Sequence, residues 1–355
     1  MKIGKIAAIA GLVLAAGLLA VPTASFIYEA GAPGACARCH EMAQPVAQWA
    51  ASTHRHVTCA ECHGSALTTD AQFHMTNAHR VFEHNFGEVA ERAGLRTADV
   101  FAILARCEKC HAREYASWSA GPHAVHYAPV FLDRKTNGQR RLMDDCLRCH
   151  GMHYAGGIRD LVTPLDNRGP WIFRDTSIGG RPAIPCLACH AIHQAGEPSQ
   201  PHVDRAGVPR QEAVMTPSLA LWDRRTGVAM PAALLPLPGM IDAGRAVKVS
   251  PDPRQALCYQ CHAPLANLQV RSGDDRTPVG VHEGLSCLAC HDKHRQTTRA
   301  SCANCHPRLS NCGRDVETMD TTFFNKGSRH NVHFVKCADC HTHGIPPRKN
   351  RERAD

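Results

Sequence analysis

The sequence predicts a mainly α-helical protein with extensive irregular loops and little β-structure. Aromatic residues make up only 5% of the 355 residues, and 27 glycines and 23 prolines interrupt regular elements along the chain. Cysteine and histidine are unusually frequent, with 19 and 24 copies. Because large apolar side chains are scarce, we expect short helices and loops to be wrapped around bound groups instead of an ordinary hydrophobic core.

The cysteines follow one repeated pattern, Cys-x-x-Cys-His. It occurs nine times and uses eighteen of the nineteen cysteines, leaving Cys312 as a free thiol, an intermolecular bridge or a packed loop residue. This spacing is typical of covalent c-type haem attachment, in which both thiols bind the porphyrin and the histidine ligates the iron. Structural zinc needs paired arms, and nine arms cannot pair evenly. A dithiol or disulfide framework needs no histidine after every second cysteine.

The sequence therefore predicts nine covalently bound c-type haems, which form the core of a multihaem cytochrome c. The attachment cysteines are Cys36, Cys39, Cys59, Cys62, Cys107, Cys110, Cys146, Cys149, Cys186, Cys189, Cys258, Cys261, Cys287, Cys290, Cys302, Cys305, Cys337 and Cys340. The proximal iron ligands are His40, His63, His111, His150, His190, His262, His291, His306 and His341.

Fifteen further histidines can supply sixth ligands, so we expect mostly bis-histidine irons that carry electrons and offer substrates no open site. Three motifs extend to a histidine three residues on, at His153, His193 and His294, and the ninth has His343 nearby. If the motif histidine lies on a helical turn, the later one shares its face and is held too close to reach the far side of its own iron. We expect it to ligate a neighbouring haem; a propionate or water partner is the alternative.

The first apolar run, residues 6–28, follows Lys2 and Lys5 and is long enough to span a bilayer. It predicts a single anchor in the cytoplasmic (inner) membrane, with the haem domain in the periplasm. The alternative is a signal peptide cleaved near residues 23–25, which gives a secreted protein in the same compartment.

The net charge of +8 does not indicate nucleic-acid binding, because haem propionates offset it and pair with Lys and Arg.

The motif spacing predicts how the chain is divided and where short hairpins lie. We expect an anchor at 1–30, haems 1–3 at 31–115, haems 4–5 at 116–195, a Pro-rich haem-free connector at 196–255, haems 6–9 at 256–345 and a basic disordered tail at 346–355. Short hairpins are expected near 218–230, with a turn near Arg225–Gly227, and near 130–142, at Asn137–Gly138. The connector hairpin would either dock a partner or brace the two haem groups on either side of the connector, haems 4–5 and haems 6–9.

Residues 1–90 resemble the start of the NapC/NirT/NrfH family of membrane-anchored multihaem quinol dehydrogenases. The matching features are the anchor, CARCHEM, and Ser-x-His before the second motif in QWAASTHRHVTCAECHG. The resemblance implies that Met42 ligates the first haem in place of His40 and that His54 serves a different haem; a methionine packed on porphyrin is the alternative. For the quinol site it offers His79, Glu83 and His84, without a residue-by-residue match.

The remainder resembles octahaem and other large multihaem cytochromes through short motifs. These are CHAREYASWSAGPHA, GVHEGLSCLACHDKH and SRHNVHFVKCADCH, and they imply His123, His282 and His330 as distal ligands. The full set of expected distal ligands is Met42, His54, His84, His123, His153, His193, His282, His294 and His330.

These features favour an electron conduit from membrane quinol to a redox partner protein, a second cytochrome or a terminal reductase, at a periplasmic or outer-surface location. Catalysis beyond quinol dehydrogenation at haem 1 is not assigned. A catalytic reductase or oxidase of nitrogen or sulfur compounds needs an open iron, and the chain has surplus histidines and no Cys-x-x-Cys-Lys motif. A subunit of an extracellular haem filament would require cleavage of the N-terminal segment.

Overall fold

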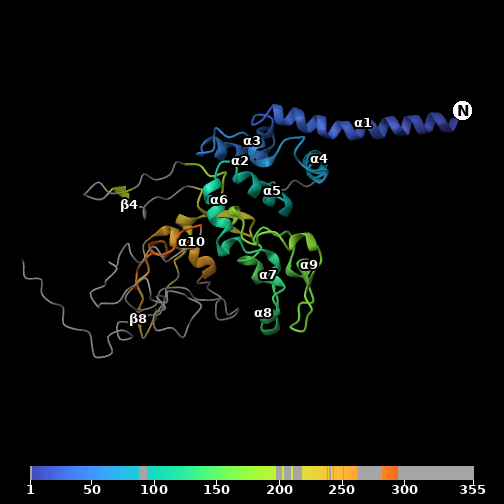
Figure 1. Ribbon diagram of the computed structural model, residues 1–355. Helices are drawn as coiled ribbons and strands as arrows, with labels where there is room; N and C mark the ends of the chain where they lie inside the picture. Colours follow the sequence, from blue (N-terminus) through green and yellow to red (C-terminus); the bar gives the residue numbers. More distant parts are fainter. Residues whose placement is uncertain are drawn as a thin grey trace, which may run out of the picture. The chain divides into compact units, whose positions relative to one another are not determined.

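In a computed structural model the chain forms two compact units (Figure 1). Unit 1 comprises Met1–Gln200 and Met215–Pro231, and unit 2 comprises Pro201–Val214 and Ala232–Asp355. The structure describes residues 2–87, 94–196, 202–203, 209–210, 218–237, 239, 241–242, 244–250, 252–262 and 282–294. Within these ranges the chain is mainly helical, with long loops and little β-structure, which confirms the predicted fold class.

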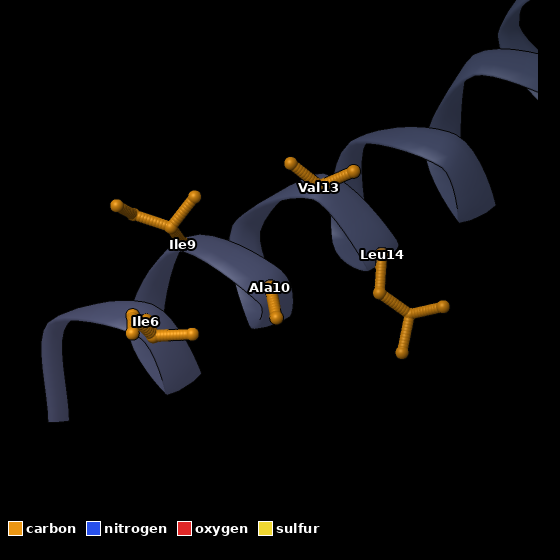
Figure 2. Close-up of a pocket in the computed structure, with 5 residues that line it drawn as sticks. All are labelled: Ile6, Ile9, Ala10, Val13 and Leu14. Carbon is orange, nitrogen blue, oxygen red and sulfur yellow. The ribbon is translucent and has the colours of Figure 1, made fainter. Parts of the chain in front are cut away.

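Unit 1 begins with one long helix, α1 (Lys2–Ala30). Its span Gly4–Ala30 has a mean hydropathy of 2.2 and none of it is buried against the rest of the protein. Figure 2 shows Ile6, Ile9, Ala10, Val13 and Leu14, which line one side of the helix. Leu12, Leu18 and Leu19 lie on other sides of it by helical spacing and are also exposed. A helix that is apolar on all sides and lies outside the core is suited to a membrane, and at 1.5 Å per residue α1 is roughly 43 Å long.

Short helices make up most of the remaining regular structure. In unit 1 these are η1 (Cys36–Arg38), α2 (His40–Ala50), α3 (Cys59–His63), α4 (Ala71–Phe86), α5 (Thr97–Cys107), α6 (Ala112–Ser119), η2 (Pro122–Ala124), α7 (Tyr127–Phe131), α8 (Arg134–Gln139), η3 (Asp144–Arg148), α9 (Ile158–Leu161), η4 (Thr176–Ile178) and η5 (Cys186–Ala188). In unit 2 they are η7 (Ala232–Leu234), α10 (Pro253–His262) and η8 (Cys287–Ala289).

The described strands form four separate two-stranded antiparallel ribbons. Unit 1 holds β1 (Val162–Thr163) with β2 (Ile172–Phe173), and β5 (Ala220–Asp223) with β6 (Val228–Pro231). Unit 2 holds β3 (His202–Val203) with β4 (Pro209–Arg210), and β7 (Ile241–Asp242) with β8 (Arg245–Ala246).

The hairpin expected near 218–230 is confirmed. Strand β5 pairs with β6 in a register that places Ala220 opposite Pro231 and Asp223 opposite Val228. The turn between them closes at Gly227, whose φ of 65° lies in the left-handed region that glycine adopts without strain.

The hairpin expected near 130–142 is wrong, because that segment forms α7 and α8. The Asp133 carboxylate caps α8 by accepting a hydrogen bond from the Thr136 N–H at 2.9 Å. Asn137 is buried, and its side-chain amide donates to the carbonyl of Phe131 at 2.7 Å. The Asn-Gly pair therefore lies within a capped helical turn and does not connect two strands.

The hydrophobic core of unit 1 lies around the fourth Cys-x-x-Cys-His motif. Its buried residues are Phe101, Tyr127, Phe131, Leu142, Leu147, Ile158, Leu161, Val162, Phe173, Ile178 and Ala183. Leu147 lies between the two cysteines of that motif and is fully buried. By contrast, η1, α2, α3 and α4 contain no buried residue, so the first two motifs lie outside this core.

Candidate functional site

Four of the described Cys-x-x-Cys-His motifs share one local backbone arrangement, a tight helical turn, whereas in the first motif Cys39 is extended, with φ of −91° and ψ of 133°. In the third, fourth, fifth and seventh motifs, the N–H of the histidine donates to the carbonyl of the first cysteine. These bonds are His111 to Cys107 at 2.9 Å, His150 to Cys146 at 3.0 Å, His190 to Cys186 at 3.0 Å and His291 to Cys287 at 2.8 Å. Such a turn brings positions three apart to one side, so both thiols can reach one porphyrin edge.

All fourteen described motif cysteines are free thiols, and each is half-buried except Cys110, which is exposed. The eighth and ninth motifs, with Cys302, Cys305, His306, Cys337, Cys340 and His341, lie outside the described residues, as do Cys312 and His330. Half-buried thiols beside histidines fit covalent haem attachment, which needs sulfur atoms that are held in place but accessible to the ring.

The motifs of unit 1 lie close to one another in a series. Burial raises the pKa of the Cys36 thiol, and the nearby Cys59 thiol of the second motif raises it further. The pKa of Cys62 is likewise raised, first by burial and then by the thiols of Cys107 and Cys110 in the third motif. The Cys107 thiol is in turn hydrogen-bonded to that of Cys186 in the fifth motif. Motifs 1, 2, 3 and 5 therefore follow one another in space.

Unit 2 shows the same kind of neighbouring arrangement. The Cys258 thiol of the sixth motif is hydrogen-bonded to the Cys287 thiol of the seventh. The side chain of Gln255, on α10, accepts a hydrogen bond from the Cys287 N–H at 3.1 Å. Motifs 6 and 7 are thus directly adjacent. The expected ligands His282 and His294 flank the seventh motif and are both half-buried.

Three pairs of histidines face each other across gaps of the size that an iron requires. A metal–imidazole bond is about 2 Å long, so two imidazoles on opposite sides of one ion have ring centres roughly 6 Å apart. The ring centres are 5.3 Å apart for His40 and His84, 6.1 Å for His54 and His111, and 5.8 Å for His63 and His193. Each pair joins one motif histidine to a histidine from outside that motif.

Burial keeps three of these imidazoles, those of His54, His63 and His193, in the form that binds metals. The pKa of His63 is lowered to about 4, mainly by burial and then by the nearby His193. The pKa of His193 is lowered by burial and then by His54, and that of His54 by burial and then by His111. At neutral pH these rings are therefore neutral, and a neutral imidazole nitrogen is the iron ligand.

At the first motif, Glu41 orients His84. The Nδ1 atom of His84 lies 2.8 Å from Oε1 of Glu41, and this hydrogen bond is the main reason that the pKa of Glu41 is lowered. Ligand atoms of Cys39, Glu41 and His84 lie within 4.8 Å of one another. A carboxylate on Nδ1 fixes the ring and leaves Nε2 to ligate a metal. The other expected ligand of this iron, Met42, lies half-buried in α2.

The His153 ring is also buried and fixed by a hydrogen bond, as expected for an iron ligand. It is hydrogen-bonded to the backbone of Leu187 in the fifth motif, and burial lowers its pKa to about 4. Among the described residues, its buried Nε2 atom has no hydrogen-bond partner. A buried imidazole nitrogen without a partner is costly in a folded protein unless it binds something, and an iron meets that need.

The structure differs from the expected helical geometry after the motifs. η3 ends at Arg148, and Gly151, with φ of 95°, turns the chain away from the helical path before His153. A Cβ atom at Gly151 would lie only 3.0 Å from Tyr127 and Leu147, so this close turn requires glycine. η5 likewise ends at Ala188 before His193. These histidines are placed by loops, which is why each can reach another motif.

The hairpin β5–β6 contacts both the fourth and the fifth motif. The N–H of Ala220 donates to the Cys189 carbonyl at 3.0 Å, and the N–H of Ala191 donates to the Ser218 carbonyl at 2.7 Å. Trp222 stacks on His153 with ring centres 4.7 Å apart, and its Nε1–H donates to the Met152 carbonyl at 3.1 Å. These contacts hold the hairpin against the segment of haems 4 and 5, and its role as a partner dock or as a brace between two haem groups stays a prediction.

Among the quinol-site candidates, His84 adjoins the first motif. Nε2 of His79 lies 3.2 Å from Oε1 of Glu83, one turn further along the same helix α4. His123 lies half-buried in η2.

Sequence reasoning missed three residues, Glu41, Trp222 and His74. The ring of His74 bridges Ser25 of α1 and Thr69, at 2.9 and 3.1 Å. Only Glu41 had a sequence signal, its place inside the first motif.

Two segments of the chain match models of known haem-protein families. Residues 106–163 match cytochrome c554 and c-prime, and residues 246–307 match cytochrome c7 and related cytochrome c. These segments contain the third, fourth, sixth, seventh and eighth motifs. No curated protein and no solved structure is significantly similar to the chain.

The repeated motifs, the facing histidines and these two matches define the class of protein. It is a multihaem c-type cytochrome, an electron-transfer protein whose haems are covalently attached through cysteine thioethers. Its particular similarities are to the cytochrome c554 and cytochrome c7 groups, each over a limited segment of the chain.

We expect Trp222→Ala to disturb the haem that His153 serves while the other haems stay native. Loss of the stacked ring frees the imidazole and removes about 1–3 kcal/mol of stability. Redox titration should show one shifted component, and the thermal midpoint should fall. Trp222→Phe keeps a ring but not the N–H donor, so it separates stacking from the Met152 hydrogen bond. Native potentials and stability in Trp222→Ala would show that the hairpin does not position His153.

Proposed function

We propose that the protein is a membrane-anchored nonahaem cytochrome that transfers electrons from membrane quinol to a redox partner. The partner is a periplasmic or outer-surface acceptor, either another cytochrome or a terminal reductase. The observation that carries this proposal is the series of motifs in unit 1. It begins with Cys36, just after the end of α1, and continues through motifs 2, 3 and 5, whose thiols are close enough to shift one another's pKa, with Cys107 and Cys186 hydrogen-bonded.

The contacts at the end of α1 support an anchor that stays attached to the haem domain. α1 continues without a break through residues 23–25, the alternative cleavage region. The Ser25 hydroxyl lies 2.9 Å from Nδ1 of His74, and the Glu29 carboxylate accepts a hydrogen bond from the Ala66 N–H at 2.8 Å. Residues 6–25 are about 30 Å long as a helix, which matches the hydrocarbon thickness of a bilayer. Lys2 and Lys5 then lie on the cytoplasmic side.

The surroundings of the first motif support its assignment as the site where electrons enter. A quinol releases protons as well as electrons, so its oxidation site needs a proton acceptor close to the iron. His84 and Glu41 are hydrogen-bonded beside the first motif, and His79 with Glu83 lies on the same helix. The ring of His84 faces His40, which makes His84 a rival to Met42 as the ligand of the first iron.

The histidine pairs support closed, six-coordinate irons along the series. We assign His54 to the iron of His111, and His193 to the iron of His63, on their ring separations. His54 lies just before the second motif and pairs with the histidine of the third, and His193 lies just after the fifth motif and pairs with that of the second. Each ligand therefore links two attachment sites. With both axial positions filled by protein, the attached haems supply one-electron transfer and offer no open position to a substrate.

Full-length protein in native membranes should be reduced by a water-soluble naphthoquinol analogue. We expect Met42→Leu to slow this reduction by roughly tenfold if the methionine ligates the first iron, and His84→Leu to do so if the histidine does. Dithionite, which needs no quinol site, should reduce every haem in both variants. If quinol leaves the native protein oxidised while dithionite reduces it, the proposed electron donor is wrong.

A further inference from the structure

We propose that helix α4 is a second membrane contact, whose apolar face lies in the lipid interface next to the anchor α1. This inference rests on the proposed function, because it assumes that α1 crosses the bilayer. It goes further in assigning a lipid-binding surface to the haem domain itself.

The polar and apolar sides of α4 are placed the opposite way round from those of an ordinary surface helix: the mainly polar side contacts the protein and the apolar side is exposed. Phe73, Asn77, Arg80 and His84, spaced four, three and four residues apart, lie on one side and are half-buried. This side contacts the protein. The Arg80 guanidinium donates to the Gly94 carbonyl at 2.5 Å, His84 binds Glu41, and the Arg96 guanidinium lies 5.8 Å from the centre of the Phe73 ring.

The opposite face of α4 is apolar and exposed. It consists of Ala71, Met75, Ala78, Phe82 and Phe86, a stripe at helical spacing. Met75, Phe82 and Phe86 are 59%, 60% and 79% exposed, and the two phenylalanine rings are 5.2 Å apart. The half-buried side of α4 carries His84, whose ring faces His40, so the first haem would lie on that side. The opposite stripe faces away from this porphyrin and therefore needs another apolar environment outside the protein.

The position of α4 identifies that environment as lipid. Figure 1 shows α4 beside the part of α1 that leads into the haem domain. Ser25, which contacts His74 of α4, is the last residue of the stretch 6–25 that spans the hydrocarbon. The level of α4 is therefore the membrane surface. Leu67 follows Ala66, whose N–H donates to the Glu29 carboxylate of α1. Leu67 is 88% exposed and extends the apolar surface toward α1.

The proposal can be tested with photoactivatable lipid. Full-length holo-protein is reconstituted into vesicles of phosphatidylcholine and phosphatidylglycerol that contain a phosphatidylcholine with a diazirine in its acyl chain. After illumination, lipid adducts are mapped by mass spectrometry. We expect adducts on peptides from α1 and on the peptide 71–86. Phe82→Glu/Phe86→Glu should reduce labelling of α4 about tenfold and leave that of α1 unchanged.

The control is Ile172→Glu, which places the same charge on an exposed apolar residue of β2 and should leave α4 labelling native. Because all three side chains are exposed, haem content should be unchanged in every variant. Labelling of α1 without α4 would overturn this inference and leave the anchor standing, whereas labelling of neither would overturn both. Adducts that persist in the double variant, or α4 cross-linked only to a second copy of the chain, would also overturn it.

Discussion

In the chain produced without attached haem, residues 31–63, which carry the first two motifs, are expected to be unfolded. The reason is the distribution of buried side chains. η1, α2 and α3, which hold these two motifs, contain no buried residue, whereas the core around Leu147 is built of protein side chains. A segment without buried apolar side chains cannot offset the conformational entropy of ordering its backbone. Attached porphyrin supplies the missing apolar surface, so the fold of this segment depends on it.

Far-UV circular dichroism and limited proteolysis will check this expectation. The haem-free chain should lose the helical signal of α2 and α3 and should be cut throughout 31–63. In the holo-protein, Cys59→Ser/Cys62→Ser should expose the same segment while the core around Leu147 and Phe131 stays protected longer. Cys312→Ser is the matched control, because Cys312 is the one cysteine outside the motifs, and it should keep full haem content. A haem-free chain with a native spectrum and cooperative unfolding would contradict the argument.

The sequence was sufficient for features encoded by local patterns. The attachment motifs, the helix of residues 2–30 and the hairpin β5–β6 each follow from residues that are close together in the chain. The ribbon expected near 130–142 failed for a local reason, since the capping side chain of Asp133 outweighed the turn preference of Asn-Gly.

The ligand pairs could not be predicted from the sequence because they depend on long-range folding. Nothing near His63 indicates that its ring faces His193, 130 positions later. The same holds for Trp222 and His153, which a hairpin and a glycine turn bring together. A surplus of histidines limits what the ligands are, but only the path of the loops determines which iron each one serves.

His54→Ala is expected to convert one low-spin haem to a high-spin, five-coordinate form. The His54 ring faces that of His111 at 6.1 Å, and its loop is held in place. The His54 N–H donates to the buried Ser52 hydroxyl at 3.1 Å, and the Ala51 carbonyl accepts from the Gly196 N–H at 3.0 Å. Because alanine removes only the side chain, the loop should stay folded and the iron should lose its sixth ligand.

Low-temperature electron paramagnetic resonance of the oxidised protein should then show one new high-spin signal, and the potential of that haem should rise. The matched control is His56→Ala, two residues away on the same loop, whose exposed side chain should leave every signal native. Added imidazole should restore the low-spin signal of His54→Ala, because a free ligand can occupy the vacated position. If His54→Ala keeps all irons low-spin while His56→Ala does not, the loop presents His56 to the iron and the pairing with His111 is wrong.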